Sequence, residues 1–299
     1  MSDAHAMLVD PALEWWLGRL GLREDDLEQT RAVLAAVRAD DAAVTMVADL
    51  VATRRRGLGH FPGEPGYLLW PGYQAADDPY GVGVLPLLAL VVTAPDLVAF
   101  HRGRGVAEAV TARTLTELGQ QVWVHRRTFG RFGLHTYDWL PVTWSGSLYW
   151  LGRLQVNLQR LDQEWVCSSH IPQAGPLDPA AVEDSFEAAA TFFPAHFPER
   201  PVEDLWCSSW LLDPDLAAAL GPDANIARFQ ARWHLYGEPM PGDEDALFFT
   251  FARRGPVDLD TLPQDTRLQR TVVARLRAGQ HWTVRQGRLP LPASAGGAR

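Results

Sequence analysis

One pattern occurs twice in the chain, as Trp165-Val166-Cys167-Ser168-Ser169-His170-Ile171-Pro172 and as Leu205-Trp206-Cys207-Ser208-Ser209-Trp210-Leu211-Leu212. Each copy begins as a short apolar strand and leads through an Asp-Pro pair into a helical run. Asp178 and Asp213 occupy the N-cap position of these helices, because proline is favoured directly after a cap. A strand, a crossover helix and a second strand form a unit whose two strands are parallel. Ligands of such sheets bind beyond the carboxyl ends of the strands, which places the candidate site near His170 and Trp210.

The composition is that of a globular protein and excludes several classes of function. With 299 residues, 47% of them hydrophobic, and 12 tryptophans, the chain can fill two domains or one large one. Its formal net charge of −9 argues against general nucleic-acid binding, which needs a basic surface. All 27 basic residues are arginine. The chemistry therefore uses no lysine base and no Schiff base.

Cysteine, metal and membrane signals are weak. Two cysteines cannot form a disulfide framework or a four-cysteine zinc site, and His, Asp and Glu do not cluster at metal-ligand spacing, so we expect no metal. The longest apolar stretch, residues 82–100, is interrupted by Pro86, Pro95 and Asp96, which predicts a buried helix instead of a membrane span. Residues 1–10 lack the basic and apolar regions of a signal peptide. These features predict a cytoplasmic protein with reduced cysteines and no membrane partner.

Residues 1–140 are predicted to form an all-helical domain. Apolar residues recur at helical spacing over residues 11–20, 25–38, 40–56, 84–94 and 105–133. The segment 84–94 is apolar on all sides, as is typical of the central helix of a bundle. In the last segment, which is the longest, His125 lies on the apolar stripe between Val122 and Phe129. It is therefore either a core histidine with satisfied hydrogen bonds or a residue that faces the substrate.

After residue 140 the hydrophobic period changes from helical to alternating, so residues 141–299 are predicted to form a second domain. The predicted strands are residues 142–150, 151–161, 165–171, 205–212, 226–236, 246–253 and 282–291, and the predicted helices are residues 180–193 and 266–278. The resulting fold class is α+β, with an N-terminal all-helical domain followed by a mixed sheet flanked by helices.

Several short motifs carry a resemblance to a known family. They are Leu151-Gly152-Arg153-Leu154-Gln155, His170-Ile171-Pro172, Gly175-Pro176-Leu177, Ser209-Trp210-Leu211-Leu212-Asp213-Pro214, and Asn225-Ile226 with Arg228-Phe229. Together with the helical first half, they resemble an actinobacterial family of acyltransferases with a helical N-terminal domain. The C-terminal domain of that family is GNAT-like, which means that it is similar to the N-acetyltransferase fold. The resemblance covers roughly residues 10–285, and its motifs specify the family better than the reaction.

The resemblance implies that acyl-CoA is the co-substrate and that it binds where two parallel strands separate. The pyrophosphate is expected at the loop 172–178, where helix N–H groups and the helix dipole favour an anion. The implied cofactor-binding residues are Ile171, Gln173, Gly175, Leu177 and Trp210. The loop departs from the family pattern of Gln or Arg, two residues, Gly, one residue, and Gly or Ala. It keeps the glutamine and one glycine, but not at the spacing of the pattern, and Pro176 removes a backbone donor while Asp178 adds a negative charge.

Three residues are candidates for catalysis, and each has a structural alternative. His170 suits a general base for an amine near neutral pH, or it caps the strand edge by hydrogen bonding. Cys207 accepts the acyl group on a covalent route, or it is a small buried hydrophobe. Ser209 protonates a leaving thiolate, or it hydrogen-bonds to the backbone. Asn225 is either a substrate-binding residue, together with His125, or part of a turn.

These features predict an N-acyltransferase that moves an acyl group from acyl-CoA, or from an acyl carrier protein, to the amine of a small molecule by direct attack. The helical domain is expected to build the acceptor pocket. Two alternatives remain open at this point. One is a thioester hydrolase or related enzyme that uses Cys207 or water, and the other is a non-catalytic acyl-CoA-binding module on the same fold.

Overall fold

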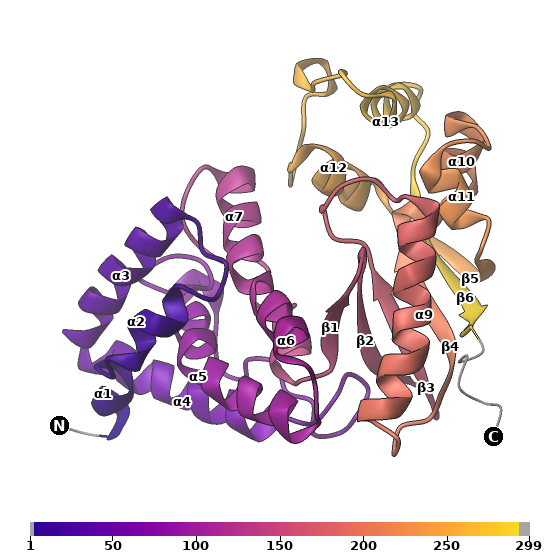
Figure 1. Cartoon of the computed structure of the whole chain (residues 1–299). Helices are drawn as coiled ribbons and strands as arrows, with labels where there is room; N and C mark the ends of the chain where they lie inside the picture. Colours follow the sequence, from indigo (N-terminus) through magenta and orange to yellow (C-terminus); the bar gives the residue numbers. More distant parts are fainter. Residues whose placement is uncertain (1–2, 293–299) are drawn as a thin grey trace. The chain divides into compact units, whose positions relative to one another are not determined.

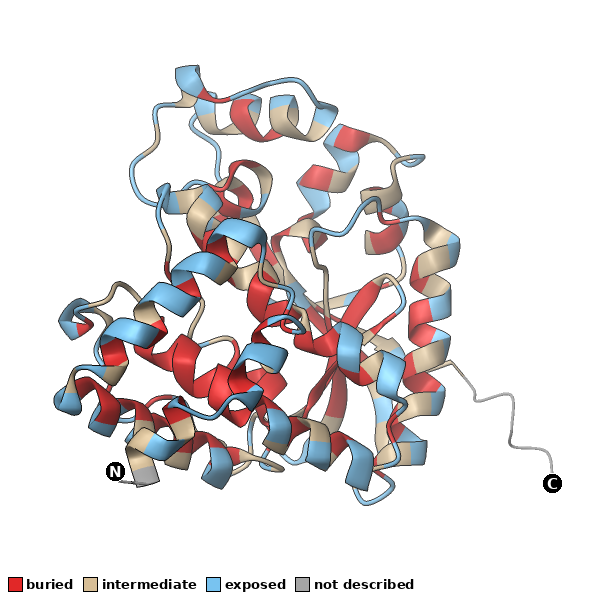
Figure 2. Cartoon of the chain, turned by 60° about the vertical axis from the view of Figure 1, so that its left-hand side comes forward, coloured by how far each residue is buried: buried red, intermediate tan, exposed pale blue. Residues whose placement is uncertain are grey.

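The computed structural model describes residues 3–292, which fall into two compact units (Figure 1). The first unit contains the chain up to Trp150 together with Asn157–Gln163, and the second contains Leu151–Val156 and the chain from Glu164 onward. The helical first part is followed by a mixed sheet with flanking helices, so the predicted fold class is confirmed. Burial is concentrated in the interior helices and strands, whereas the outward helix faces are exposed (Figure 2).

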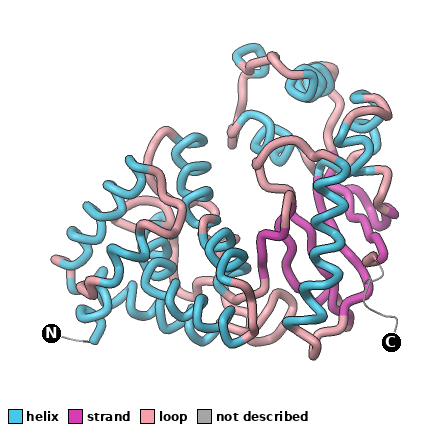
Figure 3. The backbone as a smooth tube through the Cα atoms, in the orientation of Figure 1, coloured by secondary structure: helices cyan, strands magenta, loops and turns pink. Residues whose placement is uncertain are grey.

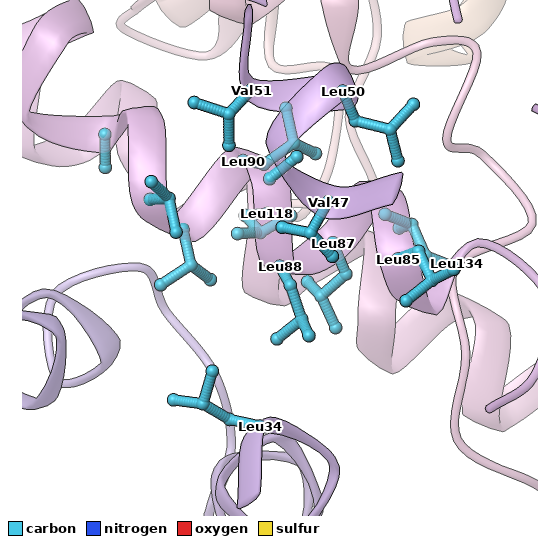
Figure 4. Packing of buried hydrophobic residues seen from close by; sticks show 14 of the residues in the cluster. Leu34, Val47, Leu50, Val51, Leu85, Leu87, Leu88, Leu90, Leu118 and Leu134 are labelled. Atoms are coloured by element: carbon cyan, nitrogen blue, oxygen red, sulfur yellow. The ribbon is translucent and has the colours of Figure 1, made fainter. Parts of the chain in front are cut away.

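The first unit is built around one apolar helix. Its helices are α1 (Asp3–Leu8), α2 (Ala12–Leu17), α3 (Glu24–Arg38), α4 (Asp41–Gly57), α5 (Val84–Gly103), α6 (Glu108–Leu115), α7 (Glu117–Phe129) and α8 (Pro141–Trp144), with the 3₁₀ turn η1 (Ala75–Asp77) before α5. The predicted central helix is α5, whose side chains, among them Leu87 and Leu90, pack with Leu34, Val47 and Leu118 in one core (Figure 4). α5 is long and apolar enough to cross a membrane, but most of it is buried within the protein, as is usual for a core helix.

The long helix predicted over residues 105–133 is two helices, α6 and α7, that meet at Thr116. The side chain of Thr116 donates to the Arg113 carbonyl, which offers the backbone an alternative to a continuous helix. The N–H of Gly119 donates to the Leu20 carbonyl at 2.8 Å, so the first turn of α7 is held by a contact outside the helix. The longest helix that the structure describes is therefore α5, with 20 residues.

The sheet begins with β1 (Leu148–Leu151) and β2 (Leu154–Leu161), which contain residues of both units. The remaining elements are β3 (Glu164–His170), α9 (Pro179–His196), β4 (Val202–Ser209), η2 (Trp210–Leu212), α10 (Pro214–Leu220), α11 (Asn225–Gln230), β5 (His234–Pro241), α12 (Asp243–Phe251), η3 (Leu259–Thr261), α13 (Arg267–Arg277) and β6 (Thr283–Pro290). The strand order is β1-β2-β3-β4-β6-β5. β3 and β4 are parallel, as predicted, whereas β6 is antiparallel to both β4 and β5. The crossover between β3 and β4 is α9, and both Asp178 and Asp213 are N-caps, as predicted.

Four predicted strands of the second half are wrong in whole or in part. They are residues 142–150, which begin with α8, residues 205–212, which end in η2, residues 226–236, which contain α11 before β5, and residues 246–253, which lie mostly in α12. An apolar run such as residues 247–249 is compatible with a buried strand or a buried helix, since periodicity does not separate the two over so short a stretch. The acidic residues 243–245 in the first turn of α12 favour the helix, because negative charge is stabilised at a helix N-terminus.

Candidate active site

The parallel strands β3 and β4 separate at their carboxyl ends. Their backbone pairing includes Cys167 with Leu205 and Ser168 with Trp206, and it stops there. β4 nevertheless stays paired with β6 as far as Ser209. Beyond Ser168, β3 thus leaves β4 and leads into the loop that joins it to α9 (Figure 3). This divergence is the place that the sequence predicts for the ligand.

The two faces of the sheet carry different side chains at this point. Side chains alternate along a strand, and paired residues of neighbouring strands share a face. The pairing therefore places Cys207 on the same face as Cys167, and His170 on the opposite face with Ser168. The distance of 3.3 Å between Ser168 Oγ and His170 Nε2 agrees with this assignment. The structure does not bring His170 and Cys207 together as a base and its nucleophile.

Cys207 lies in a closed environment. Its side chain is 1% exposed, and burial raises the pKa of the thiol to about 12, so the reactive thiolate is scarce at neutral pH. On the same face, a Cβ at the paired residue Gly287 would come within 2.9 Å of Trp233 Cβ, which shows how tightly that face is packed. These observations favour a small buried hydrophobe over a nucleophile.

His170 ends β3 and is partly buried. Burial lowers its pKa from the ordinary 6.5 to about 4, so the imidazole is neutral at pH 7 and can accept a proton. Its contact with the Ser168 hydroxyl helps to orient the ring. Burial also makes this imidazole a weaker base than it is in water. Proton removal from an amine is therefore expected to accompany bond formation and not to precede it.

β4 ends at Ser209, and Trp210 begins the 3₁₀ turn η2. The Ser209 hydroxyl accepts the Leu211 N–H at 3.1 Å and so caps the turn η2. Trp210 is 3% exposed and packs edge-on against Trp282, with ring centroids 6.2 Å apart. Both residues thus make contacts that stabilise the second unit itself, and a role for them in catalysis or ligand binding stays a prediction.

The loop between β3 and α9 is attached to its surroundings through side chains. Gln173 Nε2 donates to the Phe249 carbonyl of α12 at 2.6 Å, so this side chain holds the loop against that helix. Gly175 has a φ of +101°, in the left-handed region that favours glycine, and a Cβ there would meet no atom within 4 Å. Leu177 is buried and Ile171 is partly buried. Of the predicted cofactor-binding residues, Gly175 is therefore the one that leaves open space beside the loop.

Arg153 is part of the motif at residues 151–155, and no role was predicted for it. In the structure, its guanidinium donates to the carbonyls of Pro172, Gly175 and Pro176, at 3.1, 2.7 and 2.8 Å. One side chain from the β1–β2 turn thus holds the loop before α9. The sequence signal that points to it is a Gly-Arg pair in a tight turn between two strands.

The two predicted substrate-binding residues lie in different units. His125, in α7 of the first unit, is 1% exposed, and its Nδ1 accepts the His135 N–H at 2.9 Å. Burial, and to a smaller extent the neighbouring His135, lowers its pKa to about 4. Asn225 is the first residue of α11 in the second unit and is partly exposed. Among residues 3–292, no three His, Cys, Asp or Glu side chains lie together as metal ligands.

Comparisons with known proteins identify the family. Residues 12–146 match the family of the N-acyltransferase N-terminal domain, and residues 148–289 match that of the GNAT-like C-terminal domain. Among solved structures, an acyltransferase in complex with decanoyl-CoA is 35% identical in sequence, with a TM-score of 0.83, over 92% of this chain and 86% of that one. The chain belongs to this acyltransferase family.

Two further similar structures are also acyltransferases, each 34% identical over 92% of this chain and 86% of theirs. One is a mutant in complex with octanoyl-CoA, with a TM-score of 0.82, and the other is in complex with CoA and 10C-Teicoplanin, with a TM-score of 0.80. The search among curated proteins found no match. The resemblance seen in the motifs is thus confirmed at the level of the GNAT-like acyltransferases, and the protein is an acyltransferase.

Proposed function

We propose that the protein transfers an acyl group from acyl-CoA to the amine of a small molecule by direct attack. The observation that carries the proposal is the divergence of β3 and β4 beyond Ser168 and Trp206, followed by a loop and α9. It occurs in a chain that is 35% identical to an acyltransferase crystallised with decanoyl-CoA. In this arrangement the amides of pantetheine would pair with the strand edges, and the pyrophosphate would lie at the loop before α9.

The chemistry needs a base and a site for negative charge. The amine nitrogen attacks the thioester carbonyl carbon, a C–N bond forms, and the C–S bond breaks. The proton of the amine passes to the neutral imidazole of His170, and the electron pair of the C–S bond leaves with the sulfur of CoA. Backbone N–H groups at the divergence stabilise the charge that develops on the carbonyl oxygen. Transfer of the proton from His170 to the thiolate restores the neutral imidazole.

A covalent route through Cys207 lacks support in the geometry. The thiol lies on the sheet face opposite to His170, and burial raises its pKa to about 12. An acyl group on Cys207 would also need space on the packed face around Trp233 and Leu212. Direct transfer is therefore the mechanism that we propose.

The acceptor is proposed to be a small molecule that carries an amine. Two related acyltransferases were crystallised with teicoplanin compounds, one with CoA and 10C-Teicoplanin and the other with decanoyl-CoA and teicoplanin. Decanoyl-CoA and octanoyl-CoA are bound in similar structures, so a medium-chain acyl-CoA is the donor that we propose to use first. An acyl carrier protein as donor, an actinobacterial source and a cytoplasmic location stay predictions.

The test is turnover of decanoyl-CoA with a panel of small-molecule amines. Release of the CoA thiol gives the rate, and mass spectrometry of the acylated amine identifies the product. We expect a rate that depends on the amine. Thiol release at one rate with and without amines would contradict transfer, and a lack of CoA binding in calorimetry would contradict the proposed site.

A further inference from the structure

The turn between β1 and β2 is attached to α9 through a single hydroxyl group. Ser185 Oγ accepts the N–H groups of Arg153 and Leu154, at 2.8 and 3.3 Å, and donates to the Ala181 carbonyl at 2.8 Å. Gly152 has a φ of +69°, and a Cβ there would come within 2.8 Å of Ser185 Oγ, so the close approach needs glycine. The turn therefore has a fixed position against the first half of α9.

From this position, Arg153 reaches the loop that precedes α9. Its Nη1, Nη2 and Nε donate to the carbonyls of Pro172, Gly175 and Pro176, respectively, at distances between 2.7 and 3.1 Å. A planar guanidinium with donors in a rigid fork can hold three carbonyls at once, whereas an ammonium group cannot match that pattern. No carboxylate within residues 3–292 forms an ion pair with Arg153, so its positive charge is not neutralised by a partner.

Holding the carbonyls also sets the direction of the N–H groups. In a planar trans peptide, the C=O and the following N–H point in opposite directions. The N–H group of Leu177 follows the bound carbonyl of Pro176, so it points away from the guanidinium. The loop therefore directs this backbone donor to one side and has the positive charge of Arg153 on the other.

We propose that Arg153 is the positioning residue that makes this loop a pyrophosphate site, an inference that rests on the proposed use of acyl-CoA. The loop lacks the last Gly or Ala of the family pattern, Pro176 has no N–H, and Asp178 carries a negative charge at the helix cap. Arg153 offsets these three features, because it fixes the loop backbone that carries the Leu177 N–H and adds a positive charge on the other side of that backbone.

The experiment compares Arg153→Gln with the unchanged protein on two donors, decanoyl-CoA and the decanoyl thioester of N-acetylcysteamine, which lacks the phosphates. With decanoyl-CoA, we expect KM to rise by about 10- to 100-fold and kcat to stay within about threefold of its value in the unchanged protein. The reason is that the substitution removes charge-assisted hydrogen bonds that lie away from the reacting atoms, so it weakens binding of the donor and leaves the chemical step in place. With the truncated donor, kcat/KM should be unchanged. Inhibition by adenosine 3′,5′-bisphosphate should weaken by the same factor as KM rises.

Arg153→Lys separates the charge from the fork geometry. In this variant the KM for decanoyl-CoA should lie between those of Arg153→Gln and the unchanged protein, because an ammonium group restores the charge but not the three carbonyl contacts. The control is Arg228→Gln, since Arg228 is an arginine of α11 that pairs with the exposed Asp223. Melting temperatures show whether each variant is folded.

The outcomes separate this inference from the proposed function. An equal loss on both donors would show that Arg153 acts only through the fold, and an unchanged KM for decanoyl-CoA would show that it has no role; either result overturns the inference. If the unchanged protein does not bind CoA, the proposed function fails, and this inference fails with it.

Discussion

The two copies of the Cys-Ser-Ser pattern have similar sequences but end in different structures. After β3, residues 171–178 form an open loop before α9, and His170 at the strand end is partly buried. After β4, the chain turns at once through η2 into α10, and Trp210 in the corresponding position is 3% exposed. One local pattern thus produces one strand end that is followed by a loop and another that is buried in a core.

The two aspartate caps show the same contrast. Asp178 is exposed and accepts the N–H groups of Ala180 and Ala181 within its own helix. Asp213 is 2% exposed, and its carboxylate accepts the N–H of Asp215 as well as the N–H and hydroxyl of Thr283 in β6, at 2.7 to 2.8 Å. The first cap fixes the start of a helix, whereas the second also ties a helix to the sheet.

The largest effect is expected at the end of the first copy. His170→Ala should lower kcat by a factor of about 10²–10⁴, the usual contribution of a general base, while the melting temperature changes little. The measurement is the rate of decanoyl transfer to an amine, with melting followed by circular dichroism. In the same assay Cys207→Ala should stay within about threefold of the unchanged kcat, because direct transfer does not use the thiol.

His234→Ala is the matched control, since His234 is an exposed histidine in β5. Its kcat should equal that of the unchanged protein. A nearly normal kcat for His170→Ala would remove this residue from the mechanism, and an acyl adduct trapped on Cys207 would replace direct transfer with the covalent route.

The second effect compares the two caps. Asp213→Ala removes the acceptor of three hydrogen bonds in a buried place and should lower the free energy of unfolding by about 3–5 kcal/mol. Asp178→Ala removes an exposed cap and should cost about 1 kcal/mol. Urea denaturation of both variants measures the difference. Equal losses would show that the structural contrast between the copies has no energetic counterpart.

Sequence alone predicts the features of these copies that depend on neighbours along the chain. The Asp-Pro pairs identify both caps, and the strand-helix-strand spacing identifies the parallel pair. The different ends could not be predicted in this way, because distant residues determine them. Trp210 packs against Trp282, which comes much later in the sequence. The loop after His170 is held by Arg153, which lies in the turn between β1 and β2.

The same reason explains the errors in secondary structure. The apolar run in α12 has no periodicity that separates a helix from a strand, and its helical state depends on the packing of Phe248 and Phe251 in the second unit. The face of the sheet on which Cys207 lies could be assigned only from the register of β3 with β4. His170 and Cys207 look like a plausible base and nucleophile in the sequence, because the sequence does not show the register of the two strands and therefore not the face on which each side chain lies.

The third effect is a pH dependence that the second copy lacks. Burial lowers the pKa of His170 from 6.5 to about 4, so the unfolded chain takes up a proton first as the pH falls. Protonation then favours the unfolded chain, so the contribution of His170 to the free energy of unfolding is complete above about pH 6.5 and is lost as the pH falls to about 4. Trp210, in the corresponding position, does not titrate.

His170→Gln should therefore reduce the loss of unfolding free energy between pH 7 and pH 4.5. We expect a reduction of about 1–2 kcal/mol after allowance for partial solvent screening. Urea denaturation at the two pH values measures it. Burial also lowers the pKa values of His101 and His125 to about 4. These two residues are present in the variant and in the unchanged protein, so part of the loss of stability in acid remains in both. An unchanged pH dependence would mean that His170 is not held neutral by burial.

The smallest effect concerns the charge of the first cap. Asp178→Ser keeps an acceptor for the N–H groups of Ala180 and Ala181, so the free energy of unfolding should change by less than about 0.5 kcal/mol. The substitution removes a negative charge beside the proposed pyrophosphate site. KM for decanoyl-CoA should therefore fall by about two- to threefold at low salt, because the carboxylate is exposed and its repulsion is screened. The difference should disappear near 1 M salt, where the Debye length is about 3 Å. Asp213→Ser, in the second copy, should lower stability without this decrease in KM. A decrease that persists at high salt would show that Asp178 acts through the shape of the loop and not through its charge.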